Sequence, residues 1–230
     1  MNRPKTLVNA AMSADGKLDS VVRKGISISS FADKARVDRL RASMDAVLIG
    51  GRTLLDEDPK LTVKSPALRA ERTAKGLEEN PAKVGVVSLA GLKLGGNFLN
   101  TGPARRLIYT TRRTSPEQIT HLENAGAQVF VIGELHVDLS AVLASLYGQG
   151  IRKLMIEGGG TIIAEFFRLG LVDELTLYIA PRIFGGASAP TLADGPGFLP
   201  GQAPDLSLES LEKFDDEGGL LVHYTVNTKE

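Results

Sequence analysis

The chain has 230 residues, of which 43% are hydrophobic and 23% charged, as is typical of a globular protein with a sizeable core. Its 27 basic and 27 acidic side chains cancel, so no bulk attraction to nucleic acid or to a membrane surface is expected. The absence of cysteine excludes disulfides, thiolate metal sites and a cysteine nucleophile. His121, His136 and His223 form no ligand pair, so we expect no metal site. With no run of eighteen apolar residues and no signal-peptide core, we expect a cytoplasmic protein.

Strand-like and helix-like segments alternate through the first two thirds of the chain. Buried strands are predicted at 5–12, 46–51, 84–89, 106–110, 127–132 and 153–156. Amphipathic or apolar helices are predicted at 31–43, 116–124 and 139–147, the first with Ser29 or Ser30 as its N-cap. The segment 64–82 is polar and interrupted by Pro66 and Pro81, so we expect an irregular excursion there. This rhythm predicts an α/β protein with a mostly parallel sheet and helices on its faces.

The last quarter changes character. Residues 174–180 and 220–226 alternate and are rich in β-forming residues, and 215–219 resembles a hairpin turn between 206–214 and the final strand. Antiparallel strands added to a parallel sheet give a mixed sheet. No internal repeat is visible, and we expect a single domain over residues 1–230.

A run of three glycines joins an apolar strand to a helical pattern. Gly158, Gly159 and Gly160 follow the strand 153–156, and a helix is expected from near Thr161. Backbone N–H groups at a helix N-terminus bind anions, and glycines let a phosphate approach the backbone. The alternative is a tight turn that binds no ligand. Because the run is not the G-x-G-x-x-G fingerprint, a Rossmann-type dehydrogenase is the least favoured interpretation.

Four motifs in a fixed order resemble one known family. They are NAAMSADGKL at Asn9–Leu18, the segment Arg36–Val63, IEGGGT at Ile156–Thr161 and LVDELTLYIAPRIFGG at Leu171–Gly186. Together they are similar to the reductase of riboflavin biosynthesis, from about Pro4 to Val226. The resemblance implies a fold like that of dihydrofolate reductase. It also implies NADPH-dependent reduction of a (ribosylamino)pyrimidine 5′-phosphate to the ribitylamino form. We expect no deaminase domain before it, because no zinc-ligand pattern is present.

The resemblance assigns roles at the cofactor. The residues that match the cofactor-phosphate loop are Gly158, Gly159, Gly160, Thr161 and Ile162. Positions that match other cofactor contacts are Ala11, Thr53, Glu57 and Ser88. Relatives usually have two aspartates before the proline that follows Thr53, whereas this chain has Glu57 and Asp58. For Asp56 and Asp58, a functional role and a simple acidic cluster at the end of a helix are equally good interpretations.

The resemblance also assigns substrate and catalytic residues. Arg41 and Lys64 match basic positions that hold the substrate phosphate, and Ser27 and Leu61 match its surroundings. Lys64 stands where many relatives have arginine, which keeps the charge but not bidentate recognition. The predicted catalytic residues are Lys17, in the Asp-Gly-Lys turn, and Glu157, at the end of the strand before the glycines.

Three alternatives remain open from the sequence. A reductase of dihydrofolate or another pterin would share the fold and the cofactor. The two basic residues Arg41 and Lys64 suit a sugar phosphate better than a pterin. A non-catalytic nucleotide-binding module would keep the glycine run without using Lys17 and Glu157. Lys17 could also be an ordinary solvated turn lysine.

The chain is expected to form a homodimer. Residues 174–180 place apolar side chains on both faces of a strand, and a glycine- and proline-rich segment, 185–204, follows. Such a strand needs cover on both sides, either from a second copy of the chain or from helices of the same subunit. The family resemblance also implies two-fold pairing in this region.

Overall fold

The computed structural model describes residues 2–227, which form two compact units. Unit 1 comprises Val37–Met155 together with the described residues up to Pro4. Unit 2 comprises Lys5–Arg36 and the described residues from Ile156 onward. Residues 1 and 228–230 of the predicted single domain lie outside the described part, and the single domain stays a prediction.

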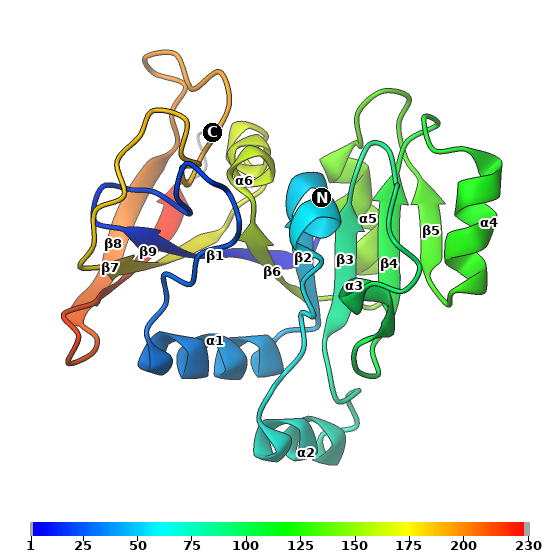
Figure 1. Cartoon of the computed structure of the whole chain (residues 1–230), viewed down its shortest axis with the longest axis horizontal. Helices are drawn as coiled ribbons and strands as arrows, with labels where there is room; N and C mark the ends of the chain where they lie inside the picture. Colours follow the sequence, from blue (N-terminus) through cyan, green and yellow to red (C-terminus); the bar gives the residue numbers. More distant parts are fainter. Residues whose placement is uncertain (1, 228–230) are drawn as a thin grey trace. The chain divides into compact units, whose positions relative to one another are not determined.

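Unit 1 is built on parallel strands. Its strands, in the order β5-β4-β3-β2-β6, are β5 (Gln128–Val131), β4 (Arg106–Thr110), β3 (Ala82–Val86), β2 (Ala46–Gly50) and the first half of β6 (Lys153–Gly158). The pairs β2–β3, β3–β4 and β4–β5 are parallel. Its helical elements are the second half of α1 (Phe31–Ser43), the π-helical turn η1 (Thr53–Glu57), α2 (Pro66–Ala74), α3 (Asn97–Asn100), α4 (Pro116–Asn124) and α5 (Leu139–Gly148). Figure 1 shows α4 beside β5.

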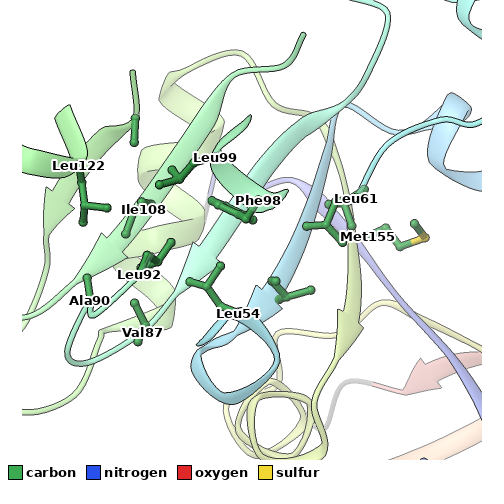
Figure 2. Packing of buried hydrophobic residues seen from close by; sticks show 13 residues of the cluster. Leu54, Leu61, Val87, Ala90, Leu92, Phe98, Leu99, Ile108, Leu122 and Met155 are labelled. Atoms are coloured by element: carbon green, nitrogen blue, oxygen red, sulfur yellow. The ribbon is translucent and has the colours of Figure 1, made fainter. Parts of the chain in front are cut away.

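The hydrophobic core of unit 1 explains why these strands are apolar throughout. All residues of β2 and β3 are buried, as expected of parallel strands covered on both faces. Leu54, Phe98, Ile108 and Met155 belong to the same buried cluster, shown in Figure 2. In α5 the buried residues are Leu139, Val142, Leu143 and Leu146, a spacing that places them on one helical face.

The prediction of an irregular excursion over residues 64–82 was wrong in part, because α2 lies within it. Ser65 caps this helix by accepting a hydrogen bond from the N–H of Leu68. Pro66 therefore occupies the first turn, where proline is favoured because that position needs no intrahelical N–H donor. The proline marks the start of a helix here and not a break.

Unit 2 contains the mixed part of the fold. Its strands follow the order β6-β1-β7-β9-β8, with β1 (Lys5–Ser13), β7 (Glu174–Ala180), β9 (Leu220–Asn227) and β8 (Asp205–Lys213). β1 and β7 are parallel, whereas β7–β9 and β8–β9 are antiparallel. Helix α6 (Gly160–Arg168) and the first half of α1 complete the unit. The predicted α/β class, with a mostly parallel sheet and antiparallel C-terminal strands, is confirmed.

Two local predictions in unit 2 are also confirmed. The Ser30 hydroxyl accepts a hydrogen bond from the N–H of Asp33 and so caps α1. The hairpin before β9 is closed by Asp215, whose carboxylate accepts from the N–H of Gly219. Among the helices of residues 2–227, none combines the length and the apolar character that crossing a membrane requires.

Candidate functional site

The turn that carries Lys17 is tightly organised. The Ser13 hydroxyl donates to the Asp15 carboxylate at 2.6 Å and accepts from the N–H of Lys17 at 3.0 Å. Asp15 also accepts from the backbone N–H groups of Phe184 at 3.2 Å and Gly185 at 2.7 Å. These donors, the Ser13 hydroxyl foremost, lower the pKa of Asp15 to about 2. Asp15 therefore ties the turn to the segment that follows β7.

The glycine run forms the junction between β6 and α6. The strand continues through Glu157 and Gly158, Gly159 is the N-cap, and the helix begins at Gly160. No side chain of the described residues caps this helix. The N–H of Ile162 donates to the Gly159 carbonyl at 3.1 Å, and the N–H groups of Gly160 and Thr161 before it point toward the end where an anion can bind. Gly158 has a φ of +138°, which only glycine adopts readily. Apart from Gly158 and its two chain neighbours, no residue of the described part has a heavy atom within 4 Å of the position where its Cβ would stand.

A connection between β7 and β8, residues 181–204, meets both of these features, and we call it the arm. Lys17 forms an antiparallel bridge with Thr191 of the arm, and the N–H of Leu18 donates to the Pro190 carbonyl at 2.8 Å. At Gly160, a Cβ would stand only 2.2 Å from the Thr191 carbonyl oxygen. The lysine turn and the start of α6 therefore share one neighbour in the arm.

In unit 1, two predicted cofactor contacts lie at the carboxyl ends of neighbouring parallel strands. Thr53 begins η1 just after β2, and Ser88 follows β3. The two strand ends touch closely, since a Cβ on Gly51 would stand 3.0 Å from Cγ2 of Val87. The Ser88 carbonyl accepts from the Thr111 hydroxyl at 2.6 Å, which fixes the backbone there. The structure thus brings Thr53 and Ser88 to one edge.

Glu57 and Asp58, at the end of η1, lie in two different environments. Asp58 has a φ of +45° and accepts from the N–H groups of Asn97 at 2.6 Å and Phe98 at 2.8 Å. It is therefore the acceptor for the first N–H groups of α3. Glu57 is exposed at the end of η1, and its role at the cofactor stays a prediction.

The predicted substrate residues of unit 1 lie on the segment 61–64 or contact it from α1. Arg41, in the last turn of α1, donates from Nη1 to the Thr62 carbonyl at 3.1 Å. The N–H of Lys64 donates to Asp38 at 2.6 Å, and the Lys64 side chain is exposed. Leu61 has its side chain in the hydrophobic core, so a substrate could meet only its backbone.

In unit 2, Ala11 and Ser27 occupy different surroundings. Ala11 is half-buried in β1 and packs against the cluster that contains Tyr178 and Ala180. Ser27 is exposed in the loop before α1. The buried Asp19 holds this loop by accepting from the N–H groups of Gly25 and Ile26. The roles of Ala11 and Ser27 stay predictions.

Thr191 and Asp194 were not predicted as site residues from the sequence. The Asp194 carboxylate accepts from the Thr191 N–H at 2.9 Å and from the Thr191 hydroxyl at 2.8 Å. The T-x-x-D spacing was a local signal for such a turn, because aspartate readily accepts from nearby backbone N–H groups. No pattern in the neighbouring sequence indicated the contact of Thr191 and Asp194 with Gly160, which lies more than thirty residues earlier.

We expect the Asp15 contacts to make the stability of the chain depend on acidic pH. A carboxylate with a lowered folded-state pKa stabilises the fold above its unfolded pKa of 3.8, and the effect is lost as pH falls toward 2. Asp15→Asn should therefore lower the thermal midpoint relative to wild type at pH 7, and the gap should close between about pH 4 and pH 2. Asp216→Asn, at an exposed position in the hairpin turn, is the control. A gap that persists unchanged at pH 2 would contradict the assignment.

Comparisons with known proteins show the family and the fold of the chain. The family model of the RibD C-terminal domain matches residues 4–218. A 2,5-diamino-6-ribosylamino-4(3H)-pyrimidinone 5′-phosphate reductase of Archaeoglobus fulgidus is 43% identical over 86% of this chain and 89% of its own length. One of the same name from Methanothermobacter thermautotrophicus is 37% identical over 97% and 99%. A pyrimidine reductase-like protein of Corynebacterium diphtheriae shares the fold, with a TM-score of 0.83 at 22% identity over 99% and 94% of the two chains. The chain belongs to the RibD C-terminal domain family.

Proposed function

We propose that the chain is an NADPH-dependent reductase that converts a (ribosylamino)pyrimidine 5′-phosphate to the ribitylamino form in riboflavin biosynthesis. The observation that carries the proposal is the uncapped N-terminus of α6 behind Gly158, with the Lys17 turn held to the same segment of the arm. Relatives whose names state this reductase activity match nearly the whole chain. A cytoplasmic location is part of the proposal, since the substrate is a biosynthetic intermediate.

The residues at the start of α6 fit a cofactor phosphate. The first N–H groups of the helix have no side-chain cap among the described residues, and the helix dipole favours negative charge there. The open space beside Gly158 leaves room for a ligand to approach the backbone. Gly158 to Ile162 would hold the pyrophosphate, with Ala11, Thr53, Glu57 and Ser88 as the further cofactor contacts that the family suggests.

The chemistry divides between the cofactor and the protein. When bound, NADPH supplies the hydride that is delivered to C1′ of the sugar. The protein must hold the opened sugar in position and move a proton at the ring oxygen or the imine nitrogen. Lys17 is suited to hold the ribose hydroxyls as an ammonium, and Glu157 to exchange the proton as a carboxylate.

The names of the relatives favour one substrate over its alternatives. Three relatives are named for the 2,5-diamino pyrimidinone, so we propose the aminated pyrimidine in preference to the deaminated one. A pterin is less favoured, because Arg41 and the Lys64 segment supply basic groups that suit a sugar phosphate. The direct test follows NADPH oxidation at 340 nm with the aminated pyrimidine, the deaminated pyrimidine and dihydrofolate in parallel. Oxidation with the aminated pyrimidine is expected, and oxidation with dihydrofolate only would contradict the proposal.

The cofactor assignment predicts the effect of a charge at Thr161. This residue is exposed in the first turn of α6. Thr161→Glu should leave the fold stable, because a negative charge suits a helix N-terminus, yet it should repel a phosphate. We expect NADPH affinity to fall about tenfold, or roughly 1.4 kcal/mol, in a fluorescence titration. Thr161→Gln, of the same size without the charge, is the control. Equal affinity of the two variants would show that no phosphate binds there.

The proposed contact of Arg41 with the substrate phosphate predicts a defect in substrate binding. Arg41→Ala removes a charge-assisted hydrogen bond and should raise KM for the phosphorylated pyrimidine about ten- to a hundredfold. The same variant should differ little from wild type with the riboside that lacks the phosphate. Arg39→Ala, exposed on the same helix, is the matched control. An Arg41→Ala enzyme with an unchanged KM would show that other residues hold the substrate phosphate.

The catalytic role of Glu157 predicts a loss of turnover without a loss of cofactor binding. Glu157→Gln keeps size and hydrogen bonding but removes the charge, so turnover should fall by about 10²–10⁴-fold. NADPH affinity should stay near wild type. Glu165→Gln, which alters a half-buried residue on α6 that pairs with Arg168, controls for a charge change in the same unit. Near-normal turnover in Glu157→Gln would make Glu157 a structural residue.

The homodimer stays a proposal, and strand β8 now supports it. β8 is the last strand in the order and is exposed along its length, with Leu206, Leu208 and Leu211 opposite Val226, Tyr224 and Val222 of β9. An exposed edge strand with an apolar face invites pairing with a second copy. Sedimentation at micromolar concentration should give twice the chain mass. Leu208→Lys with Leu211→Lys should give a monomer, and Leu135→Lys, exposed in unit 1, should not. A monomeric wild type would exclude the dimer.

A further inference from the structure

The arm is more than a connection between β7 and β8. We propose that Asp194 is a positioning residue, whose carboxylate fixes Thr191 of the arm and thereby holds the Lys17 turn and the glycine run in one arrangement. The inference rests on the proposed function of Lys17 and of Gly158 to Ile162. It concerns how their positions are maintained.

The contact with the glycine run is close and depends on the lack of a side chain. The Thr191 carbonyl oxygen stands 2.2 Å from the Cβ that any other residue would place at Gly160. A second contact joins the same residue to the arm, since the N–H of Asp194 donates to the Gly160 carbonyl at 3.2 Å. Residues 191–194 therefore lie directly against the first residue of α6, where the cofactor phosphate is proposed to bind.

The same residues of the arm hold the lysine turn. Thr191 bridges Lys17, and the N–H of Leu18 donates to the Pro190 carbonyl at 2.8 Å. Backbone contacts of this kind fix the direction in which the Lys17 side chain leaves the chain. A displacement of Thr191 would therefore disturb both the lysine and the start of α6.

Asp194 determines the conformation of this part of the arm. Its Oδ1 accepts two hydrogen bonds from Thr191, one from the N–H at 2.9 Å and one from the hydroxyl at 2.8 Å. Its Oδ2 would stand 3.1 Å from a Cβ at Gly160, so the carboxylate also packs against the first residue of α6. Residues 181–204 contain no helix or strand, so these side-chain bonds, together with backbone bonds such as those at Leu18 and Gly160, define their path.

The test compares Asp194→Ala with two further variants. Asp194→Asn keeps an oxygen that can accept from Thr191, so the exchange rate of the Leu18 amide should stay at its wild-type value. Asp138→Ala also removes a carboxylate that accepts two hydrogen bonds, but at the N-cap of α5 in unit 1, and it controls for general destabilisation. The readouts are amide exchange at Leu18 in the protein without cofactor, the NADPH dissociation constant, and turnover.

We expect Asp194→Ala to raise the exchange rate of the Leu18 amide about tenfold, to weaken NADPH several-fold and to lower turnover about tenfold. Asp138→Ala should change none of the three. The proposal is overturned if Asp194→Ala matches Asp138→Ala, or if Asp194→Asn fails to restore the wild-type exchange rate of the Leu18 amide. Should Asp194→Ala not fold, Thr191→Val, which loses only the hydroxyl bond, must show the same changes in smaller measure. A wild type that reduces no pyrimidine would defeat the proposed function, while the exchange at Leu18 would still decide the role of Asp194.

Discussion

The close approach of the Thr191 carbonyl to Gly160 is the constraint on which the arrangement of unit 2 depends. Only a residue without a side chain admits an oxygen 2.2 Å from the Cβ position, so the arm can reach the start of α6 at this point and hold the Lys17 turn beside it. Asp15 and Asp194 then fasten the two ends of the same stretch, through Phe184 and Gly185 at one end and Thr191 at the other. The strand-to-helix junction and the lysine turn are thereby held against one segment of the chain.

Much of the fold could be predicted from sequence, because hydrophobic periodicity is a local property. The helix with its Ser30 cap, the apolar strands of unit 1 and the hairpin closed by Asp215 all follow from residues close together in the chain. The helix α2 was missed because Pro66 was interpreted as a break and not as a first-turn residue. The short α3 was also missed, since its N–H groups are satisfied by Asp58, about forty residues earlier.

The candidate site was predictable in its parts but not in its connections. The glycine run and the lysine turn were visible as motifs, and the structure gives both a definite backbone geometry. Gly160 was attributed to phosphate approach, whereas the structure supplies a second reason, the packing of the arm. That reason depends on two segments about thirty residues apart, and neither periodicity nor composition reports such a contact. Leu61 likewise was assigned to the substrate, although its side chain lies in the core of unit 1.

The central claim is that the start of α6 receives the cofactor phosphates while the arm keeps the Lys17 turn beside it. A titration of the ¹⁵N-labelled chain with NADPH, followed by backbone amide shifts, tests this claim most directly. The amides of Gly160 and Thr161 should shift most, with smaller shifts at Lys17 and Leu18, since a phosphate would accept hydrogen bonds from the first N–H groups of the helix. Saturation with NADPH that leaves the amides of Gly158 to Ile162 unmoved would contradict the account.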